Sequence, residues 1–216
     1  MNNGVTLTVG VEGNRADAAI QKEARWIASE SIPGRPVEGI ATVIRNVLAS
    51  AEMKPSEMDS ICYSGGPGSL LALRTLSMIL ESWKGLDSPS GCTHFRFSGL
   101  IWTAREILRT GRESTFTVLS PWRRGACFGV FVDENQPNEK DIELFDTEKG
   151  TNHDHPTFLL GEDRHGIDLT IPVNKVLLPE LTTLQLHLDQ PGFLVETQTV
   201  SPLFNGKVDY KKWFPK

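Results

Sequence analysis

The chain has 216 residues and a formal net charge of −5, with 22 Lys and Arg against 27 Asp and Glu. This length suffices for one large domain or two small lobes with a buried core. The acidic balance argues against a broad basic surface for nucleic acid or anionic membrane, and leaves only local basic patches open. The three cysteines are odd in number and widely spaced, which is not typical of a disulfide framework or a zinc site and indicates a reducing cytoplasm: Cys62, Cys92 and Cys127.

No segment is typical of a signal peptide or a membrane span. The longest apolar run, around residues 70–80, is interrupted by Arg74 and is too short to cross a bilayer. We therefore expect a soluble, cytoplasmic protein.

The first half predicts a three-stranded meander followed by alternating helices and strands. A helix is expected over 37–50, because apolar residues recur there at intervals of three and four after Pro36. The order is βββαβαβα, and its expected segments are strands at 5–11, 16–20, 24–29, 59–64 and 94–97, with helices at 37–50, 69–84 and 98–110.

The second half predicts another meander, then shorter strand and helix segments. Its likeness to the first half suggests two related lobes that meet near residue 110, an N-terminal lobe of residues 1–110 and a smaller C-terminal lobe of residues 111–216. Its expected segments are strands at 115–119, 126–132, 142–146, 158–160 and 176–178, a helix at 181–188 and an irregular tail from 201.

A glycine turn follows the strand at 59–64. It leads into a helix N-terminus, where backbone N–H groups without partners attract anions. The same glycines are equally suited to close packing of the backbone. The Walker lysine and the Rossmann glycine spacing are both absent. The residues of this candidate anion site are Gly65, Gly66, Pro67, Gly68, Ser69 and Arg74.

The helix at 69–84 has two apolar sides. We expect the broad side to pack on the sheet, and it contains Ala72, Leu73, Leu76, Ile79, Leu80 and Trp83. Leu71 and Met78 lie on another side, next to Thr75 and Ser82. A second apolar strip needs a second surface, which is either another helix of the chain or a partner.

Other chemical patterns are weaker. Arg123 and Arg124 form a basic hairpin that suits phosphate or carboxylate, or is simply an exposed turn. His153, His155 and His165 lack a recognisable third-ligand spacing, so no metal site is expected. Neither Ser64 nor Ser69 lies in a nucleophile elbow, and we expect no catalytic residues. The basic, aromatic tail at 207–216 suits either RNA contact or an ordinary surface.

The segment GGPGSLLALR resembles the GPGSFTGLR-type motif of the TsaB/YeaZ family, the dimerisation subunit of the bacterial machinery that makes threonylcarbamoyladenosine in tRNA. SPWRRGACFGVFV resembles its ARRGEVY hairpin, and SPLF resembles its closing PxYLR segment. The three motifs occur in the family's order and extend over most of the chain. The resemblance implies an α/β fold of the actin-like, sugar-kinase and chaperone-ATPase type: two lobes of RNase-H-like topology with mixed central sheets flanked by helices.

By this resemblance, the chain is a non-catalytic scaffold. Its expected partners are a homologous threonylcarbamoyl-transferring subunit and that subunit's ATPase partner, with tRNA contacted indirectly and a homodimer left open. No cofactor of its own is implied, and ATP would bind only at the interface of the complex. The implied partner interface comprises Ile40, Ile44, Leu71, Thr75, Met78 and Ser82.

The chain departs from the family pattern at four points. The family's HSE-like entry to the first long helix appears as Pro36, Val37 and Glu38, and the closing motif lacks its terminal Leu-Arg. Leu70, Leu71 and Ala72 stand where the family has Phe-Thr-Gly, and Glu12, Gly13 and Asn14 follow the first strand where it has Asp/Glu-Thr-Ser. The departures fit a divergent member or a paralogue with another partner. The alternative is an ATP-dependent enzyme of the same superfamily, transferring a phosphoryl or carbamoyl group in the cleft between lobes with Glu12 as its metal-binding acid.

Overall fold

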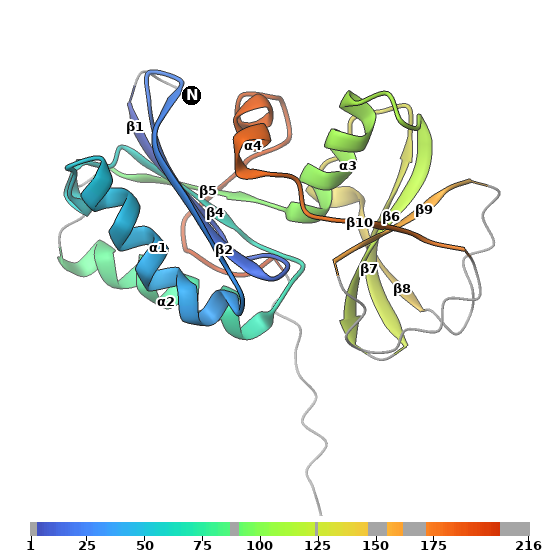
Figure 1. The fold of residues 1–216 in the computed structure, drawn as a ribbon, viewed down its shortest axis with the longest axis horizontal. Coiled ribbons are helices and arrows are strands. Elements are labelled where there is room, and N and C mark those ends of the chain that lie inside the picture. The colour runs from blue at the N-terminus through green and yellow to red at the C-terminus, as the bar shows by residue number, and fades with distance from the viewer. Residues whose placement is uncertain (1–3, 87–90, 124, 147–154, 162–171, 204–216) are drawn as a thin grey trace, which may run out of the picture.

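The computed structural model of the chain describes residues 4–86, 91–123, 125–146, 155–161 and 172–203. These residues form two mixed sheets that lie next to each other, with helices packed on them (Figure 1). The expected α/β architecture of two helix-flanked mixed sheets is therefore confirmed.

The first sheet has six strands in the order β11-β5-β4-β1-β2-β3. Strand β2 is antiparallel to β1 and β3, whereas β4 and β5 run parallel to β1. This is the RNase-H-like arrangement. Its strands are β1 (Val5–Gly10), β2 (Arg15–Lys22), β3 (Arg25–Pro33), β4 (Ser60–Ser64), β5 (Thr93–Phe97) and β11 (Val195–Thr197).

Helices cover both faces of this sheet. Helices α1 (Pro36–Ser50) and α2 (Leu70–Leu86) lie together on one face (Figure 1), and their apolar residues share one core with β1 and β4. Ala19 and Cys62 point to the other face, into a core shared with α3 (Gly99–Arg109) and α4 (Leu181–Leu188). Because both faces are covered, β1 is a continuous run of buried residues, as expected of a central strand.

The second sheet repeats the topology of the first. Its order is β10-β9-β6-β7-β8, with an antiparallel meander from β6 to β8 and with β9 and β10 parallel to β6. Strands β6, β7, β8, β9 and β10 occupy the positions of β1, β2, β3, β4 and β5, and only the edge strand β11 of the first sheet has no counterpart among the described residues. The strands are β6 (Thr115–Arg123), β7 (Ala126–Asp133), β8 (Ile142–Asp146), β9 (Thr157–Leu160) and β10 (Asn174–Val176).

The order βββαβαβα of the first half is confirmed, apart from a short 3-10 turn at Pro55–Glu57 and differences at the ends of elements. The third strand is longer than expected, because its alternating residues pair along the whole of β2 at the sheet edge. Strand β11 was missed, since three residues carry no period and only pairing with β5 defines them. Of the expected irregular tail, residues 204–216 lie outside the part of the chain that the structure describes.

Candidate functional site

The second side of α2 is uncovered. Leu71 is 65% exposed and Met78 is 74% exposed, whereas Ala72, Leu73, Leu76 and Leu80 are buried in the core of the first sheet. The expected division of this helix into a core face and a free apolar strip is therefore confirmed.

The polar residues of the strip direct their hydroxyl groups back to the helix. Thr75 Oγ1 donates to the carbonyl of Leu71 at 2.9 Å, and Ser82 Oγ donates to the carbonyl of Ile79 at 2.7 Å. Such intrahelical bonds satisfy the hydroxyl donors. A surface that covers this strip therefore needs to supply few hydrogen-bond partners.

Two residues expected at a partner interface lie elsewhere. Ile40 is fully buried and Ile44 is 2% exposed, and both pack in the core between α1 and the first sheet. The prediction that they face a partner is wrong, because they belong to the helix side that covers the sheet. The outer side of α1 instead exposes Ala41, Arg45 and Ala49.

The glycine turn is engaged by the chain itself. The Gly65 N–H donates to the carbonyl of Phe97, and the Gly65 carbonyl accepts from the Leu203 N–H, both at 2.8 Å. A β-carbon on Gly65 would lie 2.3 Å from Cδ of Arg96, so the glycine permits this close packing. The Ser69 hydroxyl accepts from the Ala72 N–H at 3.4 Å at the start of α2.

The structure describes the side chain of Arg74 but not those of the basic hairpin. Arg74 is exposed on α2 and is directed away from the core. Arg123 ends β6, but its side chain and the whole of Arg124 lie outside the described residues, so the basic hairpin stays a prediction.

A buried carboxyl lies at the end of the parallel strands. Glu12 follows β1, Ser64 ends β4, and Gly99 begins α3 directly after β5. Ser64 Oγ donates to Glu12 Oε1 at 2.5 Å, and the Gly99 N–H donates to the same oxygen at 2.9 Å. Glu12 is 2% exposed, and no donor among the described residues reaches its Oε2 with hydrogen-bond geometry.

This environment favours the protonated carboxyl. Burial raises the pKa of Glu12 from 4.5 to about 7, because desolvation penalises the charged form. The hydrogen bonds from Ser64, from Gly99 and from the backbone of Gly66 oppose this shift, and repulsion by Asp17 adds to it. The sequence marked Glu12 only as a metal-binding acid of an enzyme, and gave no indication that it would be buried.

Two arginines that the sequence analysis did not single out make long-range polar contacts, and the first of them joins the two sheets. Arg96 on β5 pairs with Glu139, which lies between β7 and β8. Arg105 on α3 is 1% exposed, and its Nε donates to the Pro137 carbonyl at 2.8 Å. Only the tertiary structure brings these pairs together, since their members are 43 and 32 residues apart.

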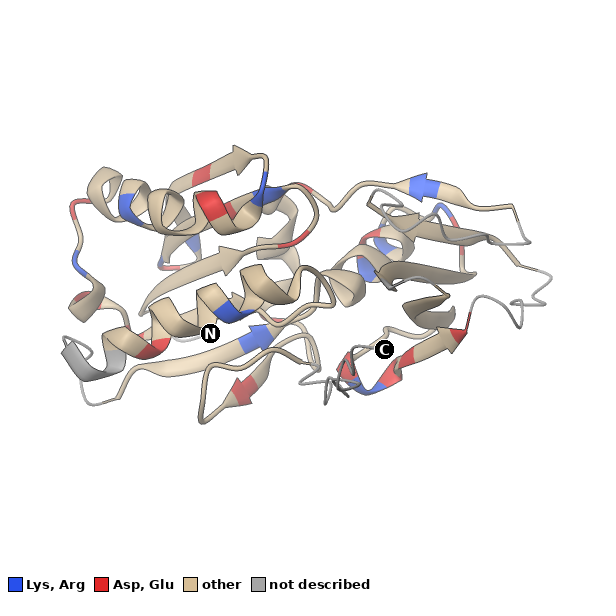
Figure 2. Cartoon of the chain, turned by 90° about the horizontal axis from the view of Figure 1, so that it is seen from below, with Lys and Arg blue, Asp and Glu red and all other residues tan. Residues whose placement is uncertain are grey.

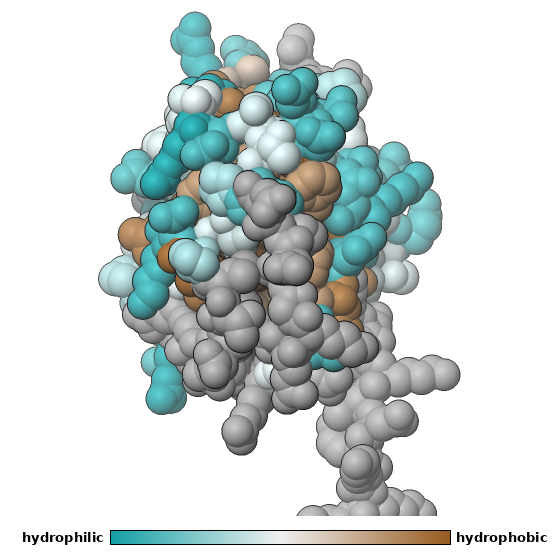
Figure 3. Space-filling view, turned by 90° about the vertical axis from the view of Figure 1, so that its right-hand side faces the viewer, coloured by the Kyte–Doolittle hydropathy of each residue, from teal (hydrophilic) through white to brown (hydrophobic). Residues whose placement is uncertain are grey.

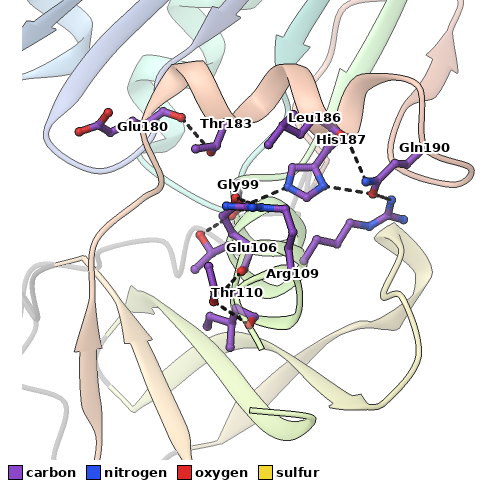
Figure 4. A network of polar contacts seen from close by, with 12 residues as sticks. Gly99, Glu106, Arg109, Thr110, Glu180, Thr183, Leu186, His187 and Gln190 are labelled. Atoms are coloured by element: carbon purple, nitrogen blue, oxygen red, sulfur yellow. Dashed lines mark hydrogen bonds and ion pairs between the residues drawn. The ribbon is translucent and has the colours of Figure 1, made fainter. Parts of the chain in front are cut away.

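Helices α3 and α4 meet through a polar network (Figure 4). Glu106 accepts two bonds from Arg109 Nε, at 2.7 and 2.8 Å, and its Oε2 lies 3.5 Å from His187 Nε2. Gln190 Oε1 lies 3.1 Å from His187 Nδ1 and accepts from Arg105 Nη1 at 3.3 Å. These contacts fix α4 against α3. Because the Arg105 guanidinium is partly desolvated in this network, burial lowers its pKa.

The histidine segment gives no metal cluster in the part of the chain that is described. His155 Nε2 lies 2.9 Å from Thr117 Oγ1, and its ring lies 4.8 Å from that of Phe131. His153 and His165 are outside the described residues. The three cysteines are free.

The surface is mixed in charge and hydropathy. Figure 2 shows basic and acidic residues interspersed over the helices and strands. At the end of the molecule formed by the second sheet, apolar patches lie among hydrophilic ones (Figure 3). The exposed large apolar residues of this half include Phe131, Leu144 and Leu177. Among the described helices, none has the length and hydropathy of a membrane span.

Comparison with solved structures gives the fold. No protein-family profile and no curated protein match the sequence. YeaZ from Pseudomonas aeruginosa is similar over 93% of this chain and 99% of its own, with a TM-score of 0.64 and 17% identity. A second structure, described as an uncharacterized protein with similarity to peptidase YeaZ from Pseudomonas aeruginosa, covers 82% of this chain and 86% of its own, with a TM-score of 0.57 and 16% identity.

The chain therefore has a two-sheet fold in which one mixed topology occurs twice. It is the fold of YeaZ, as the sequence resemblance implied.

Proposed function

We propose that this chain is a docking subunit of the YeaZ type, a scaffold for a homologous subunit that transfers threonylcarbamoyl groups in tRNA modification. The observation that carries the proposal is the uncovered strip on α2. Its apolar side chains, Leu71 and Met78, are largely exposed and can contact a partner directly. Burying a leucine or methionine side chain contributes about 1.5–3 kcal/mol, so two such side chains favour association.

The shape of the face supports a helical partner. Helix α2 packs beside α1, whose outer side carries the small residues Ala41 and Ala49. Small residues let a second backbone approach closely, while Leu71 and Met78 supply the apolar contact. A pair of helices from a homologous subunit would meet α1 and α2 as a helical bundle.

Co-purification tests the proposal. The chain is co-expressed with the threonylcarbamoyl-transferring homologue of its own organism, and only one of the two carries an affinity tag. We expect a stoichiometric complex that survives gel filtration. Recovery of the tagged protein alone, at concentrations where both are folded, contradicts the docking function.

Self-association is a separate outcome of the same surface. In the absence of a partner, two copies of the chain can cover each other's strips. Light scattering over a range of concentrations measures this, and a homodimer is expected to dissociate when the partner is added.

An ATP-dependent enzyme is the second candidate, because an acidic residue, Glu12, lies next to the glycine turn. Its carboxyl is buried against Ser64 and Gly99, whereas a metal-binding acid has to face the nucleotide. The described residues of this corner therefore do not fit magnesium and nucleotide phosphates. A titration with magnesium ATP separates the candidates, since tight binding with turnover would remove the scaffold function.

A further inference from the structure

The carboxyl ends of three parallel strands converge where Glu12 lies. In open α/β sheets, ligands bind outside the carboxyl ends of the strands, and helix N-termini there present free N–H groups to oxyanions. In this chain β1, β4 and β5 end together, and α3 begins directly after β5. The corner thus has the backbone of a ligand site.

Glu12 already takes up the donors of this corner. Its Oε1 accepts from the first N–H of α3, at Gly99, and from the hydroxyl that ends β4, at Ser64. The Ile101 N–H of the same first turn needs no ligand, because it donates to Oγ of Ser98, the N-cap residue of α3. An external oxyacid bound at the start of α3 would accept the same two hydrogen bonds with one of its oxygens.

The fit around the other carboxyl oxygen is tight. A β-carbon on Gly99 would lie 1.1 Å from Glu12 Oε2, whereas one on Gly68 would make only an ordinary contact, at 3.8 Å from Glu12 Cγ. Glycine at 99 therefore leaves room for the carboxyl and for little else. The side chain comes from the first sheet, whereas α3 packs on β6 and β7 of the second, so the contact joins the two sheets.

The charges around the corner select the ligand. Asp17 on β2 is the charged side chain that acts on Glu12, and it is itself paired with Arg15 and accepts from Ser31. Among the described residues, the Glu12 carboxyl forms no ion pair. Arg96 packs its aliphatic stem on Gly65 of the glycine turn, but its guanidinium pairs with Glu139. A buried site without a cation suits a neutral acid and penalises a phosphate, which stays charged at any pH near neutrality.

We infer that Glu12 is an internal ligand of this corner: its protonated carboxyl fills the position of an external oxyacid at the start of α3, links the two sheets, and closes the corner to phosphate groups. When the Glu12 side chain is removed by substitution, the corner binds a small carboxylic acid and rejects phosphate. This inference does not depend on the docking function.

Chemical rescue tests it. The thermal midpoints of wild type and Glu12→Ala are measured at pH 5, where a share of the acetic acid is protonated whereas phosphate stays an anion. The added salts are sodium formate, acetate, inorganic phosphate or chloride at matched ionic strength. Because excluded salts stabilise any folded protein, the readout is the midpoint shift of the variant minus that of wild type. We expect formate and acetate to give a specific rise of about 3 °C at ten times their Kd, and phosphate to give none beyond chloride.

Two results overturn the inference: no carboxylate-specific rise in the variant, or a rise with phosphate that equals or exceeds it. If Glu12→Ala does not fold, Glu12→Gln replaces it, since the amide keeps the shape and cannot ionise. The midpoint of wild type is then expected to fall relative to Glu12→Gln between pH 5 and pH 8. Parallel pH profiles of the two proteins overturn the inference.

Discussion

A β-carbon at residue 99 would lie 1.1 Å from Oε2 of Glu12, although the two residues are 87 positions apart in the chain. The start of α3 and the end of β1 therefore constrain each other. Glycine is required at 99 by a side chain of the other sheet, whereas the helix itself would accept alanine there.

We expect Gly99→Ala to lower the free energy of unfolding by about 2–3 kcal/mol, because the methyl group must displace the buried carboxyl. Urea denaturation measures the change. Gly10→Ala is the matched control, since its β-carbon would meet its nearest neighbour at an ordinary 3.5 Å. In a Glu12→Ala background the cost of Gly99→Ala should largely disappear, and an unchanged cost would mean that the carboxyl is not the obstacle.

The stability should depend on pH through Glu12. Its pKa rises from 4.5 to about 7 on folding, so the folded state binds the proton more tightly. The stabilisation is complete below about pH 4.5 and is lost as the pH rises through about 7, with a total of up to about 3 kcal/mol. Glu12→Gln removes this loss.

Denaturant titrations at pH 5, 6, 7 and 8 measure the difference between wild type and Glu12→Gln, in which the other carboxyl groups cancel. A difference that grows in favour of wild type as the pH rises would have the wrong sign for a buried acid, and would show that Glu12 is ionised and stabilised as the anion.

Charge on the uncovered strip should abolish docking and leave the fold intact. We expect the double variant Leu71→Glu and Met78→Glu to weaken association with the catalytic homologue at least 100-fold, because two carboxylates would be desolvated at the interface. Both side chains are largely exposed, so the free energy of unfolding should change by less than about 0.5 kcal/mol.

Leu186→Glu is the control for this variant, since Leu186 is 53% exposed on α4, away from the strip. Surface plasmon resonance compares the three proteins. Equal loss of binding in the control, or full binding by the double variant, would place the docking surface elsewhere.

Arg105 should be important for stability although its side chain is charged. Its guanidinium donates to the carbonyls of Pro137 and Pro191 and to Gln190, and it lies 5.3 Å from the centre of the Phe193 ring. We expect Arg105→Ala to lower the free energy of unfolding by about 2–4 kcal/mol, because it leaves buried acceptors without donors.

Arg45→Ala is the matched comparison, since Arg45 is exposed on α1 and should change stability by less than about 0.5 kcal/mol. Guanidinium denaturation of both variants gives the measurement. Similar small effects would mean that water replaces the guanidinium in the network of α3 and α4.

The elements with strong periodicity were predictable from sequence. The apolar stripe of α1, the two-sided pattern of α2 and the helix at 181–188 all appear where their residues indicate. The uncovered side of α2 was also predictable, because Leu71 and Met78 lie off the core-facing stripe of their own helix. Burial of Ile40 and Ile44 followed from the same stripe on α1, but the resemblance to a family with a helical interface led to the opposite expectation.

The corner of Glu12 was not predictable in the same way. A glutamate after a strand is compatible with a metal ligand, a solvated side chain or a buried acid, and nothing adjacent in sequence distinguishes them. Strand β11 and the arginines at 96 and 105 share this property, since each is defined by a partner more than 30 residues away.

The sequence alone determined the order of elements, the two-sided character of α2 and the resemblance to YeaZ, because periodicity and turn chemistry act over a few neighbouring residues. The tertiary structure decided which polar groups are desolvated and with what they are paired. Desolvation depends on all atoms that surround a group, and for Glu12 those atoms come from β1, β4 and α3, which only folding brings to one point.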